Sequence, residues 1–229
     1  FDYLVFADGI FSKTKSLVFE NINNLKYNFS VALRAILKGD FGRDISVFMG
    51  SNFHYVIYPI NQNNEYNFVA IIKKKLNSNE LGNYDLFNSN DFIESLKLSL
   101  NNASSLNFEK LSKIKVFPIY VSDRFPKTKK KNVYLCGDAL FAFPPSLAQG
   151  ASQSIETAKD IFESILTDSN NLYLERIKKI SSINNKSKLN TFSFQLSNPA
   201  GIFLRNIVLK YLSNNKKFLE TYLGKIYRN

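Results

Sequence analysis

A carboxylate and a glycine-containing turn flank two prolines between Gly137 and Gly150. Asp138 follows Val133 to Cys136, an apolar run of the kind that forms a buried strand. A carboxylate at the end of a parallel strand can accept hydrogen bonds from the hydroxyl groups of a ribose or polyol ligand. Asp138 is therefore the first candidate for a ligand-binding residue, and a turn aspartate that caps the strand end is the alternative.

An amphipathic helix is predicted to begin between Ala148 and Ala151, after Pro144 and Pro145. Apolar residues recur beyond it at three- and four-residue spacing, from Ile155 onwards. The free N–H groups of a helix start carry a partial positive charge and would point toward whatever Asp138 holds. An ordinary helix start with no ligand is the alternative.

The segment from Gly137 to Ala158 resembles the second flavin-binding motif of the FAD-dependent aromatic hydroxylases, which include p-hydroxybenzoate and salicylate hydroxylases. Their pattern reads G-D-A-A-H-x-x-P-P-x-x-G-Q-G-x-N-x-G-x-E-D-A. The positions that match it in register are Gly137, Asp138, Ala139, Pro144, Pro145, Gln149, Gly150, Glu156 and Ala158. The wording around Gln149 is most similar to the salicylate-hydroxylase branch. Leu140 and Phe141 replace an Ala-His pair and Ala148 replaces a glycine, so the departures concern the substrate side more than the flavin side.

Three further segments carry the resemblance along the chain. Residues 1–16 resemble the family's A-D-G-x-x-S-x-v-R segment, which places Asp8 beside the pyrophosphate and the approach of the reduced nicotinamide. Residues 29–36 and 47–69 resemble the strands that follow in the family, and residues 123–126 resemble its D-R-x-P.

The resemblance implies an FAD-dependent monooxygenase. Such an enzyme uses NAD(P)H and O2 to hydroxylate an aromatic or similarly electron-rich small molecule through a flavin hydroperoxide. No catalytic side chain is assigned. The residues implied in FAD binding are Asp8, Gly137, Asp138, Pro145, Ala148, Gln149, Gly150 and Ala151.

The fold implied is α/β (α+β), an incomplete three-layer FAD-binding domain with an antiparallel substrate-binding sheet and carboxy-terminal helices. Residues 1–16 and 119–170 are assigned to the FAD domain, 17–118 to the substrate sheet and 171–229 to the terminal helices. The chain contains no G-x-G-x-x-G, and its single methionine is Met49. We therefore expect a carboxy-terminal portion that lacks the first dinucleotide-binding βαβ unit.

Composition limits the other classes of function. The formal net charge is +11, but the lysines are spread along the chain, with runs at residues 73–75 and 127–131. A solvated basic face is favoured over a nucleic-acid surface because no nucleic-acid motif accompanies the charge, and peripheral membrane contact stays open. A single histidine, His54, argues against a multi-histidine metal site and a serine-histidine triad, so no metal is predicted. One cysteine, Cys136, and no apolar run of membrane-spanning length favour a cytoplasmic protein.

Periodicity predicts the elements around these residues. Strands are expected at residues 3–7, 30–37, 45–49, 54–60, 67–72, 116–121 and 133–136, with an antiparallel sheet where short turns join them. Helices are expected at residues 90–100, 108–114, 172–183 and 201–212, with Asn198-Pro199 between the last two.

Two rival functions remain open at this point. One is another oxidation or reduction on the same flavin scaffold, such as that of a prenyl-chain reductase. The other is a basic interaction module that has lost catalysis. The substrate, the choice between NADH and NADPH, and the oligomeric state are not indicated.

Overall fold

The computed structural model describes residues 1–19, 25–101, 106–126 and 132–227. The chain divides into two compact units. The first, called the motif unit here, contains residues 1–27, 120–191 and 212–229. The second, the sheet unit, contains residues 28–119 and 192–211. The lysine run at residues 127–131 lies outside the described residues.

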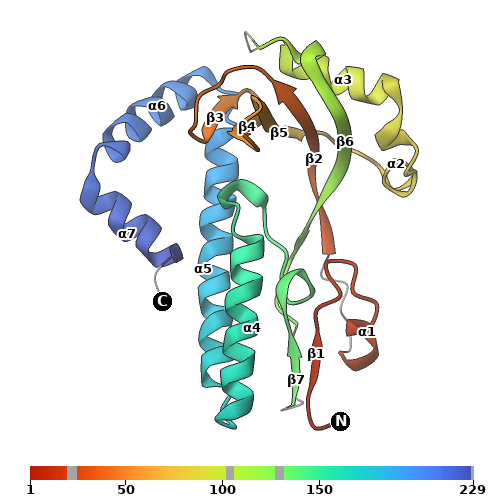
Figure 1. The fold of residues 1–229 in the computed structure, drawn as a ribbon, viewed down its shortest axis with the longest axis vertical. Helices are drawn as coiled ribbons and strands as arrows, with labels where there is room; N and C mark the ends of the chain where they lie inside the picture. The colour runs from red at the N-terminus through yellow and green to blue at the C-terminus, as the bar shows by residue number, and fades with distance from the viewer. Residues whose placement is uncertain (20–24, 102–105, 127–131, 228–229) are drawn as a thin grey trace. The chain divides into compact units, whose positions relative to one another are not determined.

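Strands and helices follow one another along the chain as drawn in Figure 1. The strands are β1 (Leu4–Phe6), β2 (Leu25–Lys38), β3 (Ser46–Gly50), β4 (Phe53–Pro59), β5 (Glu65–Lys73), β6 (Leu111–Ser122) and β7 (Val133–Leu135). The helices are α1 (Lys15–Val18), α2 (Ser78–Gly82), α3 (Asn90–Asn101), α4 (Gly150–Leu166), α5 (Asn171–Phe194), α6 (Pro199–Ser213) and α7 (Lys216–Tyr227). No described helix is both long enough and apolar enough to cross a membrane.

The sheet unit is built on a five-stranded sheet in the order β3-β4-β5-β2-β6. Strand β2 runs antiparallel to β5, from Ser30 opposite Lys73 to Lys38 opposite Glu65. Strand β4 also runs antiparallel to β5 and to β3. The predicted antiparallel sheet is therefore confirmed.

Alternate residues of this sheet form its core. Val31, Leu33 and Leu37 of β2 are completely buried, because successive strand residues point to opposite faces. The same face carries Phe68 of β5, and the Phe108 ring packs edge-on against it with 5.7 Å between the ring centroids. One face of the sheet is thus an apolar core.

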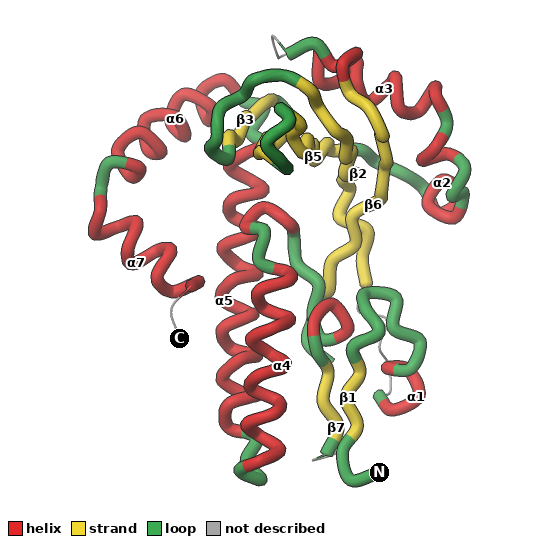
Figure 2. Tube along the Cα trace, in the orientation of Figure 1, coloured by secondary structure: helices red, strands yellow, loops and turns green. Residues whose placement is uncertain are grey.

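The motif unit contains a two-stranded parallel sheet and two long helices. Strand β1 pairs with β7, with Val5 opposite Tyr134. Helices α4 and α5 run side by side, as Figure 2 shows. Between the strands and the helices lies a core that includes Phe6, Leu135, Phe141, Ile161 and Ile180.

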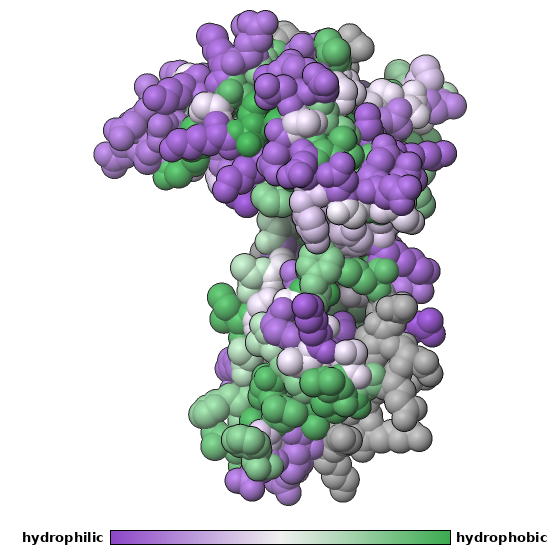
Figure 3. Space-filling model, turned by 90° about the vertical axis from the view of Figure 1, so that its right-hand side faces the viewer, coloured by the Kyte–Doolittle hydropathy of each residue, from purple (hydrophilic) through white to green (hydrophobic). Residues whose placement is uncertain are grey.

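Part of the motif unit's surface is hydrophobic. The lower part of Figure 3 shows hydrophobic residues gathered on one face, and Leu4 and Val5 of β1 are exposed. Parallel sheets normally have both faces covered, and a two-stranded sheet has little stability by itself. The strand pair therefore has the character of a fragment of a larger parallel sheet.

One predicted element is wrong, and three helices were not predicted. The helix expected at residues 108–114 is a single 3₁₀ turn, Phe108–Lys110, followed by strand β6. The apolar residues Leu111, Ile114 and Val116 are not spaced two apart as in a regular strand, and this spacing led to the prediction of a helix. The structure accommodates the irregularity at Lys113, whose φ of +52° interrupts the alternation of the strand. The short helices α1 and α2 and the carboxy-terminal helix α7 were not anticipated.

Candidate functional site

Strand β7 delivers Asp138 to the surface through a tight turn. Cys136 still donates its N–H to the Phe6 carbonyl at 2.9 Å, and the 3₁₀ turn η3 (Gly137–Ala139) begins directly after it. Gly137 has a φ of +62°, and a Cβ added there would lie 2.9 Å from the Ser154 Oγ. Both the left-handed backbone and the close approach of α4 therefore require glycine at this position.

The Asp138 carboxylate has no hydrogen-bond or ion-pair partner among the described residues. The residue is exposed at the surface, yet partial desolvation by the surrounding protein raises the pKa of the carboxyl group above its usual range. A carboxylate accepts hydrogen bonds through both oxygens. This acceptor is consequently available to a ligand that carries hydroxyl groups.

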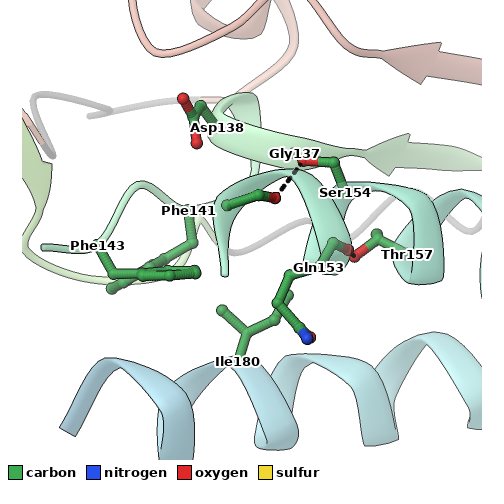
Figure 4. Close-up of a pocket in the computed structure, with 9 residues that line it drawn as sticks. Gly137, Asp138, Phe141, Phe143, Gln153, Ser154, Thr157 and Ile180 are labelled. Atoms are coloured by element: carbon green, nitrogen blue, oxygen red, sulfur yellow. Dashed lines mark hydrogen bonds between the residues drawn. The ribbon is translucent and has the colours of Figure 1, made fainter. Parts of the chain in front are cut away.

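A recess lies between η3, α4 and α5 (Figure 4). In this view the Asp138 carboxylate lies at one end of the recess and Ile180 lies at the other. Its enclosed volume is about 10 Å³, which is far less than the roughly 300–1,000 Å³ of a typical ligand pocket. The residues that line it are Gly137, Asp138, Phe141, Phe143, Gly150, Gln153, Ser154, Thr157 and Ile180.

Helix α4 begins at this recess. Gln149 is its N-cap residue, and no side chain caps the helix start. The first N–H groups of a helix have no partner within the helix. A Cβ placed on Gly150 would meet no atom within 4 Å, so the space beside this residue is open. Ala151, in the first turn, is exposed as well.

The loop before α4 is held in a fixed conformation. Pro144 is buried and extended, and Pro145, which is exposed, begins the 3₁₀ turn η4 (Pro145–Leu147). The Ser146 hydroxyl donates a hydrogen bond of 2.8 Å to the Ser187 carbonyl on α5. Ala148 then has left-handed torsion angles, with φ +52° and ψ +30°. Glycine adopts such angles without strain, which explains why the motif that this segment resembles has glycine at the position.

A chain of polar side chains supports the start of α4 from behind. Gln149 and Gln153 are buried, and the Gln153 Nε2 donates to the Gln149 Oε1 at 3.2 Å. Arg176 of α5 donates to the Gln153 Oε1 at 3.3 Å and also pairs with Glu156 and Asp160. The sequence motif includes Glu156, but we did not anticipate Arg176. The sequence does contain a sign of its role: Arg176 is a charged residue that lies between Tyr173 and Ile180 on the buried side of α5.

The segment that contains Asp8 contacts the segment that contains Asp138 through the side chain of Lys15. Asp8 is exposed and accepts a hydrogen bond of 2.6 Å from the Thr14 hydroxyl, and hydrogen bonds from Ser12 and Thr14 lower the pKa of its carboxyl group. Lys15 is buried, and its ammonium donates to the Ala139 carbonyl in η3 at 3.2 Å. Burial lowers the pKa of Lys15. The Asp8 segment is thereby tied to the turn that carries Asp138, by a residue that the sequence motif did not single out.

The predicted site residues therefore fall into two groups. Gly137, Asp138 and Gly150 line the same recess. Pro145, Ala148, Gln149 and Ala151 lie on the loop and first turn that shape it, whereas Asp8 does not line it. His54 lies in the sheet unit and is buried. Among the described residues, no cluster of His, Cys, Asp and Glu could hold a metal ion.

The recess combines an acceptor, N–H donors and an apolar wall. The Asp138 carboxylate, which has no partner among the described residues, can accept hydrogen bonds from ligand hydroxyl groups, and the N-terminus of α4 offers N–H donors to an electron-rich group. Phe141 and Phe143 supply an apolar wall. The small volume means that residues beyond this recess must enclose the rest of such a ligand.

No protein-family model matches the chain, and no curated protein matches it. Solved structures do. A variant of HpxO from Klebsiella pneumoniae, solved with FAD, superimposes with a TM-score of 0.69 at 14% identity, over 98% of this chain and 61% of that protein. HpxO with FAD and uric acid gives 0.68 at 14% identity, over 98% and 58%. A salicylate hydroxylase substrate complex gives 0.64 at 16% identity, over 97% and 64%.

The chain thus spans about three-fifths of the length of the first structures that it matches. The fold predicted from the motif segments is confirmed, since the matching structures include two solved with FAD and a salicylate hydroxylase. The chain has the fold of the corresponding part of these proteins.

Proposed function

We propose that this chain forms the substrate sheet and part of the flavin site of an FAD-dependent monooxygenase. One observation carries the proposal most directly. An unpaired carboxylate, Asp138, and the open start of a 17-residue helix line one recess. The fold around this recess is shared with proteins solved with FAD.

Each residue of the recess has a distinct part in this proposal. Asp138 accepts hydrogen bonds from the ribityl chain and so sets where the flavin lies. The N–H groups at Gly150 and Ala151 stabilise negative charge on the flavin ring through the partial positive charge of the helix start. Phe141 and Phe143 exclude water from that side. FAD, when bound, supplies the redox chemistry.

The reaction that we propose is hydroxylation of a small aromatic or similarly electron-rich molecule, with NAD(P)H as reductant and O2 as oxidant. Support comes from the neighbouring structures, because HpxO was solved with uric acid and a salicylate hydroxylase with its substrate. The antiparallel sheet β3-β4-β5-β2-β6 would form one wall of the substrate pocket.

Residues outside this chain would complete the FAD site. The matching structures extend well beyond the part that this chain covers, and the chain has no G-x-G-x-x-G for the pyrophosphate. The exposed Leu4 and Val5 of β1 give such residues an apolar surface to pack on.

Titration of FAD into residues 1–229, followed by amide resonances in nuclear magnetic resonance, tests the proposal. We expect weak binding that shifts the resonances of Gly137, Asp138 and Gly150. The Asp138→Ala variant should bind about tenfold or more weakly, because a hydrogen bond to a charged group contributes roughly 1.5–3 kcal/mol. Glu175→Ala, which removes an exposed carboxylate outside the recess, is the matched control. Shifts confined to other residues, or equal affinities for both variants, would contradict the flavin site.

Gly150→Ala provides a second, independent probe. The new methyl group meets no atom of the chain within 4 Å, so the variant should fold as the wild type does. We expect it to weaken FAD binding, since the methyl group would project into the space that the ligand uses. An unchanged affinity would place the flavin elsewhere.

A further inference from the structure

Helix α6 presents large apolar side chains to solvent. Its exposed residues include five large hydrophobic ones, and none of its residues is buried. Their exposed fractions range from 44% to 70%. We call this set the α6 apolar face: Phe203, Leu204, Ile207, Val208 and Tyr211.

These side chains lie on one side of the helix. At about 100° per residue, they fill an arc of roughly 140°. The opposite side carries Ile202 and Leu209, which are half-buried, and Arg205 donates to the Ser193 carbonyl at the end of α5 at 3.3 Å. A contiguous apolar arc of this kind on an exposed helix marks a binding surface rather than scattered exposed residues.

The charged residues of α6 and of the neighbouring sequence are all basic. On the helical projection Lys210 borders one edge of the arc and Arg205 lies near the other. Helix α6 contains no acidic residue, and neither does any position from 176 to 219. Lys216 and Lys217 follow shortly after the helix, in a chain whose net charge is +11. A complementary partner would therefore present an apolar layer to the face and negative charge to the lysine and arginine side chains beside it.

The length of α6 decides whether the helix could span such a layer or lie on its surface. Helix α6 has 15 residues, which at about 1.5 Å per residue is shorter than the roughly 30 Å needed to span a bilayer. A helix with an apolar face and basic flanks instead lies in the plane of the membrane interface. We propose that the α6 apolar face binds the surface of a membrane that contains anionic lipids. This inference stands independently of the proposed flavin site.

Vesicle sedimentation with residues 1–229 tests the proposal. We expect binding to vesicles of phosphatidylcholine mixed with phosphatidylglycerol, weaker binding to phosphatidylcholine alone, and further weakening as salt is added. Leu204→Ser should lower the partition coefficient roughly tenfold, since one apolar side chain no longer enters the interface. Lys210→Glu should lower it as well, and only for the anionic vesicles.

The chain provides a closely matched control. Leu98 on α3 has an exposed fraction of 61%, the same as Leu204, so Leu98→Ser removes equal exposed apolar character from the same unit. Binding should be unchanged in that variant. Failure to bind anionic vesicles, or an equal loss in both serine variants, would overturn the proposal. A dimer that light scattering detects in the wild type and not in Leu204→Ser, without vesicle binding, would assign the face to a second copy of the chain instead.

Discussion

Ala148 adopts a backbone conformation that its own side chain disfavours. Its φ of +52° lies in the left-handed region, where a Cβ costs roughly 1–2 kcal/mol and glycine costs nothing. The loop keeps this conformation because Ser146 is fastened to α5 and the turn η4 closes through the Ala148 N–H to the Pro145 carbonyl. Among the described residues, the left-handed conformation also occurs at Phe29, Asn52, Asn64, Lys113 and Asp168, but Ala148 is the one that lies next to the start of α4.

Replacement of Ala148 by glycine should consequently stabilise the protein, by about 0.5–1 kcal/mol. Urea unfolding of the wild type and the variant measures the difference. Ala158→Gly is the control, because Ala158 lies inside α4 and should lose about 1 kcal/mol on the same change. Effects of the same sign at both positions would show that the conformation of Ala148 is unstrained.

His54 is a buried, neutral histidine. It is 2% exposed, and the Gln195 Nε2 lies 3.3 Å from its Nδ1 while also donating to the Ile71 carbonyl. An amide nitrogen only donates, so the Nδ1 accepts and the ring carries its proton on Nε2. Burial lowers the pKa of His54 from 6.5 to about 4.

The stability of the fold should therefore depend on pH through His54. Because the unfolded chain binds this proton more tightly, the contribution is fully present above pH 6.5 and is lost as the pH falls toward 4. The loss near pH 4 is on the order of 3 kcal/mol. The free energy of unfolding in urea, measured at several pH values for the wild type and for His54→Gln, isolates the contribution of His54. The other titrating groups contribute equally to both proteins and cancel in the difference. A difference between the two proteins that stays constant from about pH 7 to about pH 4 would contradict the lowered pKa.

Single residues were predictable from sequence where a local motif carried them. Asp138 and Gly150 follow from their positions after a strand and before a helix. Lys15 and Arg176 were not predicted, because each acts through a partner distant in sequence: the Ala139 carbonyl for Lys15, and Gln153 with two carboxylates for Arg176. A one-dimensional pattern does not contain such contacts.

Among the secondary-structure elements, helices α4 and α5 are joined by ion pairs. Arg176 is 6% exposed and pairs with Glu156 and with Asp160, the latter at 2.5 Å, and Lys179 pairs with Glu156 at 3.0 Å. The same arginine contacts Gln153 at the recess. Removal of a buried partner leaves the remaining charges uncompensated, and this costs more than the pair itself contributes.

Arg176→Met should lower the free energy of unfolding by about 3 kcal/mol. Urea unfolding measures it. The control is Lys159→Met on the neighbouring helix α4, where the Lys159–Glu163 pair is exposed and should contribute under about 0.5 kcal/mol. Comparable losses in the two variants would indicate that burial of the Arg176 cluster contributes nothing.

Elements with an undisturbed period were predictable, and elements with an interrupted one were not. Strand β2 alternates from Val31 to Lys38, and β4 and β5 are nearly continuous runs of strand-forming residues, so all three were anticipated. The start of β6 was assigned to a helix because Lys113 breaks its alternation, and this break shows only in the backbone torsion angles. Helix α5 was predicted to end at Ile183 but continues to Phe194, because buried residues such as Ser187 are polar and do not mark an apolar stripe.

At the scale of the whole molecule, the chain has one nearly complete unit and one open unit. The five-stranded sheet has an apolar core with completely buried residues. The motif unit instead has a two-stranded parallel sheet with exposed Leu4 and Val5. Its recess has an enclosed volume of only about 10 Å³ and offers one carboxylate and one helix start to a ligand as large as FAD.

Residues 1–229 purified alone should therefore retain much less than one equivalent of FAD after desalting. Most of the cofactor would lie outside the recess, so few contacts oppose its dissociation. The yellow flavin absorbance, relative to protein concentration, measures the retained cofactor. A flavoprotein with a complete site, desalted in parallel, controls for loss caused by the procedure. Stoichiometric flavin in the isolated chain would mean that these residues enclose the cofactor by themselves, and the assignment of the recess as a partial site would have to be abandoned.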